Sequence, residues 1–170
     1  LSNFPAWQVV HIWHLCHENG WPKPTIYQGL YNGLSRNVEE ELIPVLRELG
    51  LRFYAYNPLA GGILSGKHSS IDKITPGRFT CRPNYKDRYW KKEFFEALNI
   101  LNAACDNRGI SVVEAAFRWM TKNSALDATA GDGVLIGASS NEQLKQNIKF
   151  FGKDNLEQDI LDAFDLSWSI

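Results

Sequence analysis

The chain has 170 residues, of which 44% are hydrophobic and 22% are charged, and its formal net charge is −1. A chain of this size without a low-complexity tract is expected to fold as one globular unit. Because lysine and arginine are scattered among the acidic residues, the sequence excludes a basic face of the kind that binds nucleic acid.

The cysteines and the apolar runs indicate the cellular setting. Cys16, Cys81 and Cys105 show neither CxxC spacing nor an even count, so we expect neither a disulfide framework nor a zinc site, and we predict a reducing, cytoplasmic setting. No apolar run approaches the roughly 20 residues that cross a bilayer, so no membrane partner is expected. The sequence begins at Leu1 without a methionine, and we expect a piece of a longer protein.

The first third of the chain alternates between strand and helix patterns. Apolar residues at helical spacing predict helices, and short apolar runs between turn residues predict strands. Gly50 should follow the second helix as its left-handed C′ residue, and the strand after it should be buried on both faces. In chain order, we expect a strand end at 1–3, a helix over 6–18, a strand over 24–28, a helix over 38–49 and a strand over 51–56.

A glycine-rich loop follows the strand at residues 51–56 directly. Pro58 ends the strand pairing, while Gly61 and Gly62 remove Cβ atoms where the phosphates of a ligand can approach the backbone. Lys67 offers a positive charge to such phosphates. The loop therefore predicts a nucleotide site. The alternative interpretation is a surface turn with a solvated lysine, because the spacing matches neither a P-loop nor a G-x-G-x-x-G turn.

The chain from Gly61 to about Arg88 has an irregular pattern, and its cations outnumber its acids. Loops this long are usually functional or disordered. A mobile, positively charged strap suits a phosphate-rich ligand, and the alternative is a flexible surface loop. Before Asp87 the segment contains Lys67, Lys73, Arg78 and Arg82 against the single acid Asp72.

The last third of the chain returns to the alternation of helix and strand. Ser111 and Glu114 predict a capping box at the start of one helix. Alternation of this kind indicates a parallel sheet covered by helices. The expected elements are helices over 91–107 and 111–123, a strand over 133–137, a helix over 139–150 and a last helix from about 156.

A second candidate ligand site lies where the strand over 133–137 leads into the next helix. Ser139 with Glu142, and Ser140 with Gln143, predict overlapping capping boxes. The free N–H groups of a helix N-terminus attract a phosphate, and residues one turn further on can reach an adenine edge. The alternative interpretation is that both serines only cap the helix.

The elements predict an α/β fold whose sheet is incomplete. Three βα units and the tail of a fourth strand fall short of a closed eight-stranded barrel, for which about 250 residues are typical. A partial barrel and an open doubly wound sheet both fit the pattern. In a half barrel, the apolar edges at 1–3 and 134–137 would need a partner, so we expect self-association of the isolated chain as a possible homo-oligomer.

Several motifs together resemble the C-terminal half of an aldo-keto reductase, nearest to the aflatoxin-aldehyde reductase branch, with the potassium-channel β subunits next. The resemblance implies a partial (β/α)8 TIM barrel, with strands 5 to 8 and their helices in residues 1–170. It also implies NADPH as cofactor, an aldehyde or ketone as substrate, and a partner in the missing N-terminal half. The motifs are Leu1-Ser-Asn-Phe4, Tyr27-Gln28, the loop 56–67, Arg88-Tyr-Trp-Lys91 and the segment 137–147.

The resemblance also implies roles for particular residues. Ser2, Asn3 and Gln28 would bind the nicotinamide carboxamide, and Tyr56 would stack on the ring. For the pyrophosphate path the residues are Asn57, Leu59, Ala60, Gly61 and Ser65, with Lys67 and Arg78 closing over it. For the 2′-phosphate and adenine they are Ser139, Gln143, Gln146 and Asn147. Because many family members have arginine where Gln143 stands, the preference for NADP over NAD depends more on Lys67 and Arg78.

The resemblance assigns no catalytic residue to this chain, because the catalytic Asp, Tyr, Lys and His of the family come from its N-terminal half. The histidines of the predicted first helix have no carboxylate or cysteine nearby in sequence, so we expect an ordinary helix face rather than a metal site. His68 is expected to be solvated, and Tyr54, Tyr85 and Tyr89 to be packing residues.

The function predicted from the sequence is the cofactor-binding half of an NADPH-dependent aldehyde or ketone reductase. Without the tyrosine, lysine and carboxylate that make a family-type acid, the segment alone should be catalytically incompetent. The alternative is a nucleotide-binding regulatory subunit similar to the potassium-channel β subunits.

Overall fold

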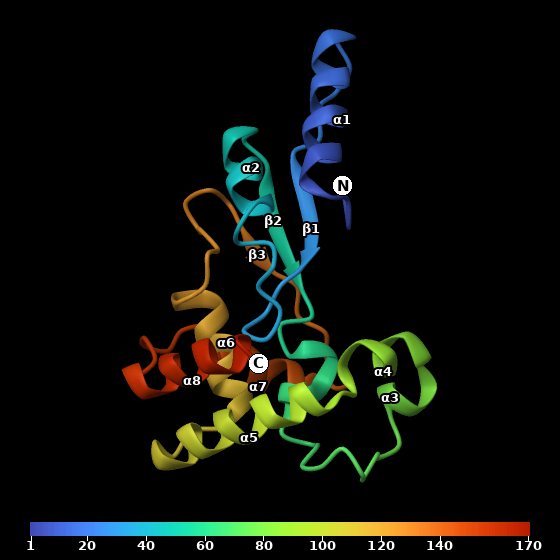
Figure 1. The fold of residues 1–170 in the computed structure, drawn as a ribbon. Helices are drawn as coiled ribbons and strands as arrows, with labels where there is room; N and C mark the ends of the chain where they lie inside the picture. The colour runs from blue at the N-terminus through green and yellow to red at the C-terminus, as the bar shows by residue number, and fades with distance from the viewer.

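The computed structural model describes residues 1–170 as an α/β structure around a small parallel sheet. Its strands are β1 (Ile26–Leu30), β2 (Arg52–Tyr56) and β3 (Gly133–Val134), in the spatial order β1-β2-β3. Both strand pairs are parallel, so the carboxyl ends of all three strands lie at the same end of the sheet (Figure 1). Polar loops meet at that end, as parallel sheets require.

The first residues of the chain join the sheet beside β1. The Leu1 amino group donates to the Ile26 carbonyl at 2.9 Å, and the Gln28 N–H donates to the Leu1 carbonyl at 2.9 Å. Ser2 forms a parallel bridge with Gln28. The strand end expected at residues 1–3 is therefore present as a single bridge next to β1.

Six helices correspond to those expected from the helical spacing of apolar residues. Gly50 follows the second of them with a φ of 67°, as predicted. That helix begins four residues late because the backbone of residues 36–39 forms a turn, closed by a bond from the Glu39 N–H to the Arg36 carbonyl at 3.0 Å. The helices are α1 (Ala6–Glu18), α2 (Leu42–Glu48), α5 (Lys92–Asn107), α6 (Val112–Lys122), α7 (Asn141–Phe150) and α8 (Gln158–Trp168).

The region between β2 and α5 is more regular than predicted. It contains the 3₁₀ helix η1 (Ala60–Ser65) and the short helices α3 (Arg78–Cys81) and α4 (Pro83–Tyr89). Phe79 is only 3% exposed, and its ring centroid lies 5.0 Å from that of Trp90. The expectation of an irregular loop was wrong because buried aromatic rings hold this segment against α5 and η1, and such contacts between distant residues leave no local periodicity.

The strand predictions also need correction. The strand expected over 24–28 is β1, which begins two residues later, and the strand expected over 133–137 is reduced to β3. Its ladder to β2 ends where the Leu135 N–H donates to the Ala55 carbonyl at 2.8 Å. In β2, Phe53 and Ala55 are buried whereas Tyr54 is half-buried, so burial on both faces was a wrong prediction for this chain.

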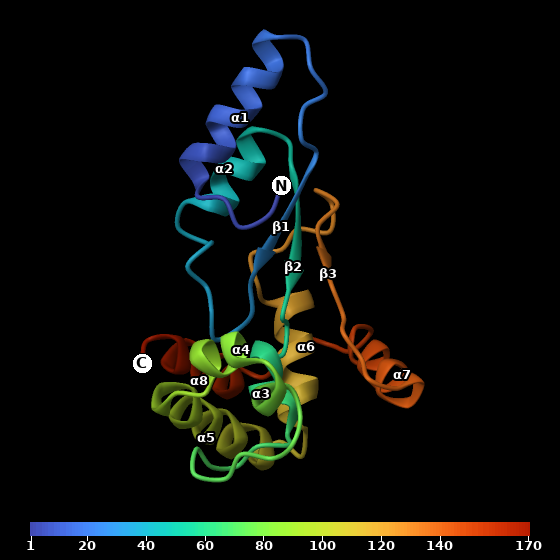
Figure 2. The ribbon, with the colours of Figure 1, turned by 90° about the vertical axis from the view of Figure 1, so that its right-hand side faces the viewer.

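The apolar core lies between the sheet and the helices beyond its carboxyl ends. Phe53, Ile63, Leu98, Met120 and Phe164 are all fully buried, and they come from β2, η1, α5, α6 and α8. Figure 2 shows α1 and α2 toward the other end of the sheet and α7 on the side of β3. None of the helices has the length and apolar character needed to cross a membrane. Because the apolar core lies between the sheet and the helices, the loops after β2 and β3 are free to form a site.

Candidate functional site

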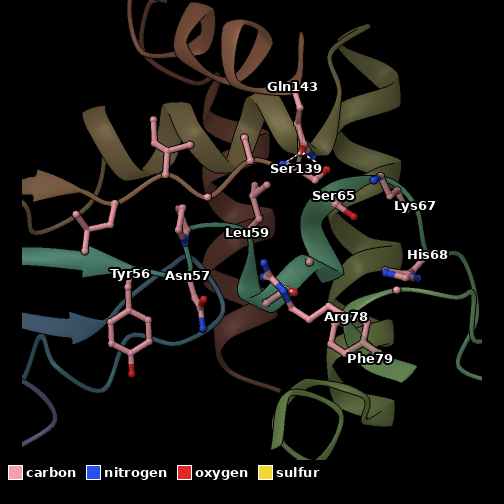
Figure 3. Close-up of a pocket in the computed structure, with 18 of the residues that line it drawn as sticks. Tyr56, Asn57, Leu59, Ser65, Lys67, His68, Arg78, Phe79, Ser139 and Gln143 are labelled. Carbon is pink, nitrogen blue, oxygen red and sulfur yellow. Dashed lines mark hydrogen bonds between the residues drawn. The ribbon is translucent and has the colours of Figure 1, made fainter. Parts of the chain in front are cut away.

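A cavity of about 630 Å³ lies at the carboxyl ends of β2 and β3. Three segments supply most of its lining, and Phe117 of α6 adds to them: the end of β2 with η1 and the residues after it, the turn that leads into α3, and the link from β3 to α7 (Figure 3). Parallel pairing thus brings together segments that are far apart in the sequence. Most of the predicted cofactor residues line this cavity, namely Tyr56, Asn57, Leu59, Gly61, Ser65, Lys67, Arg78, Ser139 and Gln143.

The predicted nicotinamide contacts form a polar group beside Tyr56. The Tyr56 hydroxyl donates to Asn3 Oδ1 at 2.8 Å, and Ser2 pairs with Gln28 across the edge of β1. Asn3 has a φ of 59°, a left-handed conformation that asparagine tolerates better than most residues. Ser2, Asn3 and Gln28 do not line the cavity, but Tyr56 connects them to it.

Asn57 connects the end of β2 to two other segments. Its side-chain amide donates to the Tyr89 hydroxyl at 3.1 Å, and its carbonyl accepts a bond from Asn32 Nδ2 at 3.0 Å. Tyr89 is fully buried, and burial raises the pKa of its phenol, so the hydroxyl stays protonated at neutral pH. Asn57 itself has a φ of 59°. These bonds hold the backbone at the cavity mouth in one conformation.

The glycine pair of η1 brings the backbone close to aromatic rings. Gly61 has a φ of 67°, and a Cβ atom placed there would lie 2.5 Å from the Tyr89 ring. The Arg78 guanidinium donates to the Gly61 carbonyl at 3.1 Å and lies 5.0 Å from the Tyr85 ring centroid. Arg78 is therefore held over η1 by contacts within the chain. Ala60 is fully buried beneath this backbone and does not line the cavity.

The opposite wall of the cavity is the amino-terminal end of α7. Ser140 caps the helix by accepting from the Gln143 N–H at 3.2 Å, as predicted. The predicted pairing of Ser139 with Glu142 is wrong, because the Ser139 N–H and hydroxyl both donate to Gln143 Oε1, at 2.8 and 2.9 Å. Figure 3 shows Gln143 reaching from α7 toward Ser139 at the cavity wall. The Gln143 side chain therefore holds the loop that precedes the helix.

The two residues expected near adenine lie outside the cavity lining. Gln146 is exposed on α7, whereas Asn147 is only 2% exposed and its Nδ2 has no hydrogen-bond partner within the chain. Asn147 and Phe150 are the buried residues of α7, three positions apart on one face of the helix. The packing of α7 against α6 thus turns Asn147 inward together with Phe150.

The charges around the cavity are all of one sign. No aspartate or glutamate lines it, whereas Lys67 and Arg78 contribute full positive charges. The amino-terminal end of α7 adds the partial positive charge of a helix dipole. A cavity with these walls favours an anionic ligand, and a group of phosphates is the anion that backbone N–H groups and cations bind together.

The sequence analysis missed part of the lining and was wrong about one histidine. Phe79, Phe117 and Leu135 line the cavity, and only the long-range packing of α3, α6 and the chain after β3 brings them there. His68, expected to be solvated, packs edge-on against the rings of Phe79 and Trp90 with centroids 5.2 and 5.1 Å away. The aromatic residues on both sides of the loop were the available signal for this packing.

The other predictions about titratable side chains fit the structure. The histidines of α1 are exposed, and His17 stacks on Trp13 with a centroid distance of 5.4 Å. Tyr89 is fully buried, while Tyr54 and Tyr85 are half-buried. The three tyrosines are therefore packing residues, as predicted.

Comparisons with known proteins identify the family of this chain. The aldo/keto reductase family matches residues 1–168, and the chain belongs to this family. It is 46% identical to aflatoxin B1 aldehyde reductase member 2 of Homo sapiens and 44% identical to the protein of that name of Rattus norvegicus, covering all of this chain and 50% and 49% of theirs. Aldo-keto reductase pigE of Monascus ruber is 32% identical over 97% of this chain and 51% of its own length. The chain spans about half the length of these relatives.

Proposed function

We propose that residues 1–170 are the cofactor-binding half of an NADPH-dependent aldehyde or ketone reductase. In this proposal the chain supplies strands 5 to 8, with their helices, of a (β/α)8 barrel, and the N-terminal half is its partner. The observation that carries the proposal is the cavity without carboxylates, between two cationic side chains and the amino-terminal end of a helix. The aldehyde substrate class is suggested by the names of the relatives.

The residues of the site fit the negative charges of a pyridine dinucleotide phosphate. Lys67 and Arg78 would pair with phosphate oxygens, and the backbone at Gly61 and Gly62 lets a pyrophosphate approach closely. Ser139 and Gln143 would hold the phosphate nearest α7. Ser65, Leu59 and Ala60 would support the pyrophosphate between Lys67 and Arg78 on one side and α7 on the other.

The polar group beside Tyr56 would bind the nicotinamide end of the cofactor. Ser2, Asn3 and Gln28 supply a hydroxyl and two amides, the groups that a carboxamide requires as partners. The flat face of Tyr56 suits stacking on the ring. When bound, NADPH would supply the hydride that reduces the carbonyl. Gln146 and Asn147 remain proposed adenine contacts, and Asn147 would have to turn outward for this role.

We also propose that the chain by itself does not turn over substrate. A general acid must protonate the carbonyl oxygen, and a tyrosine in this role needs a lysine and a carboxylate to lower its pKa. Tyr89 has the opposite environment, because burial raises the pKa of its phenol. The protonating groups would then come from the N-terminal half.

Two measurements on the purified chain test this function. Titration with NADPH, followed by nicotinamide fluorescence, should show saturable binding that is tighter than binding of NADH, because only NADPH carries the 2′-phosphate. An assay with a simple aldehyde should show no oxidation of NADPH by this chain. Absence of NADPH binding by a folded chain would refute the cofactor role, and steady turnover would refute the proposed division between the two halves.

A further inference from the structure

Three glycines of the chain follow an asparagine or an aspartate directly. The pairs are Asn19-Gly20, Asn32-Gly33 and Asp132-Gly133. In such a pair the backbone nitrogen of the glycine can attack the side-chain Cγ of the residue before it, because glycine has no Cβ to hinder the approach. The reaction needs an accessible side chain and a backbone that can rearrange, so the tertiary structure decides which of the pairs reacts.

Two of the three pairs are held inside the protein. Asn32 is fully buried, its Nδ2 donates to the Asn57 carbonyl at 3.0 Å, and its Oδ1 accepts from the Leu34 N–H at 2.9 Å. The side chain of Asp132 is 1% exposed and accepts from the Phe53 N–H at 2.7 Å. Attack at either side chain would require these buried hydrogen bonds to break, so the fold protects both pairs.

The third pair, Asn19-Gly20, lies at the exposed carboxyl-terminal end of α1. The Asn19 Nδ2 donates to the Leu15 carbonyl at 2.8 Å, one turn back in the same helix. The Gly20 N–H, whose nitrogen would attack, makes a long bond of 3.3 Å to the His17 carbonyl. Gly20 has a φ of 67°, the left-handed conformation of a C′ glycine. The groups that restrain this pair therefore all belong to the last turn of α1.

That last turn has little attachment to the rest of the molecule. The buried residues of α1 are Ala6 and Val9, both near its start, and no residue of its second half is buried. Figure 1 shows α1 extending past the sheet, away from α5, α6, α7 and α8. Helix ends that lack buried contacts open locally at a small cost in free energy. The last turn can therefore release Asn19 and Gly20 while the rest of the chain stays folded.

We propose that Asn19 is a site of spontaneous deamidation in the folded protein. The Gly20 backbone nitrogen bonds to the Asn19 Cγ and closes a succinimide ring. The bond from Cγ to Nδ2 breaks, and ammonia leaves with the proton of the Gly20 N–H. Water then opens the ring at either of its carbonyls, which yields aspartate or isoaspartate at position 19. Water is the only co-reactant, and the inference does not depend on the proposed cofactor role.

The modification places a new negative charge at the carboxyl-terminal end of α1. That end is the negative pole of the helix dipole and already contains Glu18, so the charge is unfavourable there. Both products also lack the Nδ2 donor that Asn19 directs to the Leu15 carbonyl. Isoaspartate in addition lengthens the main chain by a methylene group. The last turn of α1 should therefore unwind once Asn19 has reacted.

The decisive experiment incubates the folded chain in mildly alkaline buffer and maps deamidation by fragment-ion mass spectrometry. Trypsin releases both asparagines in one peptide, residues 1–36, because Pro24 prevents cleavage after Lys23. Asn32 is therefore a matched control within the same peptide. We expect Asn19 to be converted roughly tenfold or more faster than Asn32, since Asn32 reacts only when buried structure opens. The aspartate and isoaspartate forms should separate on chromatography.

The same incubation in urea shows whether the fold causes the difference. In the unfolded chain Asn19 and Asn32 should react at similar rates, because each is followed by glycine. Hydrogen exchange in the last turn of α1 should be faster in the aged folded chain than in the fresh one, and unchanged exchange would refute the predicted unwinding. Equal rates at Asn19 and Asn32 in the folded chain would overturn the inference. So would an Asn19 that stays intact in the folded chain but reacts in urea.

Discussion

The Asn57 side-chain amide donates to the Tyr89 hydroxyl at 3.1 Å, and this bond connects the end of β2 to the last residue of α4. It fixes the segment between β2 and α5 against the strand from which it departs. Since Tyr89 is also the ring against which Gly61 packs, one buried side chain positions both the strand end and the glycine pair. The cavity mouth is therefore held by packing within the chain.

Replacement of Tyr89 by phenylalanine tests that bond. The Tyr89→Phe protein keeps the ring but leaves the Asn57 amide without its partner, which should lower the free energy of unfolding by about 1 to 2 kcal/mol. Urea denaturation followed by circular dichroism measures this loss. Tyr54→Phe is the control, because the Tyr54 ring is half-buried and its hydroxyl makes no hydrogen bond within the chain. An equal effect of the two changes would contradict the role of Tyr89.

Lys67 and Arg78 should contribute most of the electrostatic attraction for the cofactor. The double change Lys67→Ala and Arg78→Ala should weaken NADPH binding by roughly 2 to 4 kcal/mol, because two charge-assisted interactions are lost. Fluorescence titration measures the effect. Lys73→Ala removes a cation from the same loop that does not line the cavity, and it should leave the affinity close to that of the wild type. A double variant with unchanged affinity would remove both residues from the site.

Alanine substitutions at Gly61 and Gly66 distinguish the cost of steric crowding from the cost of backbone strain. Both have a positive φ, of 67° and 73°, but an added Cβ meets the Tyr89 ring only at Gly61. Gly66→Ala should therefore cost about 1 to 2 kcal/mol from strain alone, and Gly61→Ala roughly 2 to 4 kcal/mol because overpacking is added. Thermal and urea denaturation would compare the two. Equal stability of the two variants would show that the Tyr89 ring yields to the extra methyl group.

The buried Arg118 side chain should hold α6 to the chain after α7. Arg118 donates to Glu114 at 3.2 Å and to the Asn155 carbonyl at 2.6 Å, and its side chain is 7% exposed. Arg118→Ala should lower stability by about 3 kcal/mol or more, because the buried Glu114 carboxylate loses one of its two cationic partners and the Asp154 and Asn155 carbonyls lose their donor. Lys92→Ala breaks an ion pair of the same i, i+4 spacing on the exposed face of α5 and should leave the denaturation midpoint almost unchanged. A small effect of Arg118→Ala would mean that Lys153, whose Nζ lies 2.8 Å from Glu114 Oε2, neutralises the carboxylate by itself.

Two cysteines should differ sharply in their reactivity. Burial raises the pKa of the Cys105 thiol to about 11, and the thiolate is the reactive form. Cys81 is exposed on α3. We expect iodoacetamide at pH 8 to modify Cys81 within minutes and Cys105 only after unfolding in urea, as peptide mass mapping would reveal. Modification of both at similar rates under native conditions would mean that α5 opens readily.

Local sequence patterns predicted most of the helices. The bounds of α1 agree at both ends, and those of α5 agree within one residue, because each helix carries an apolar stripe and a clear stop signal. The motifs that suggested a nucleotide, at residues 56–67 and 137–147, both line the cavity. Their shared position was predictable because the carboxyl ends of parallel strands meet at one end of a sheet.

Other features depended on contacts that a local pattern does not contain. The inward orientation of Asn147 follows from the packing of α7 against α6, and the position of His68 follows from two aromatic rings on other segments. The short helices α3 and α4 exist because Phe79 and Tyr89 are buried. Each of these depends on the neighbours of a side chain rather than on its spacing along the chain.

The sequence by itself determined where the six helices with apolar residues at helical spacing lie, and which loops carry the glycines and cations of a phosphate site. These properties arise from short-range spacing and from the conformational preferences of single residues. Only the tertiary structure decided which side chains face the cavity and how they are held there. Burial and long-range hydrogen bonds select one orientation among several that the local sequence allows.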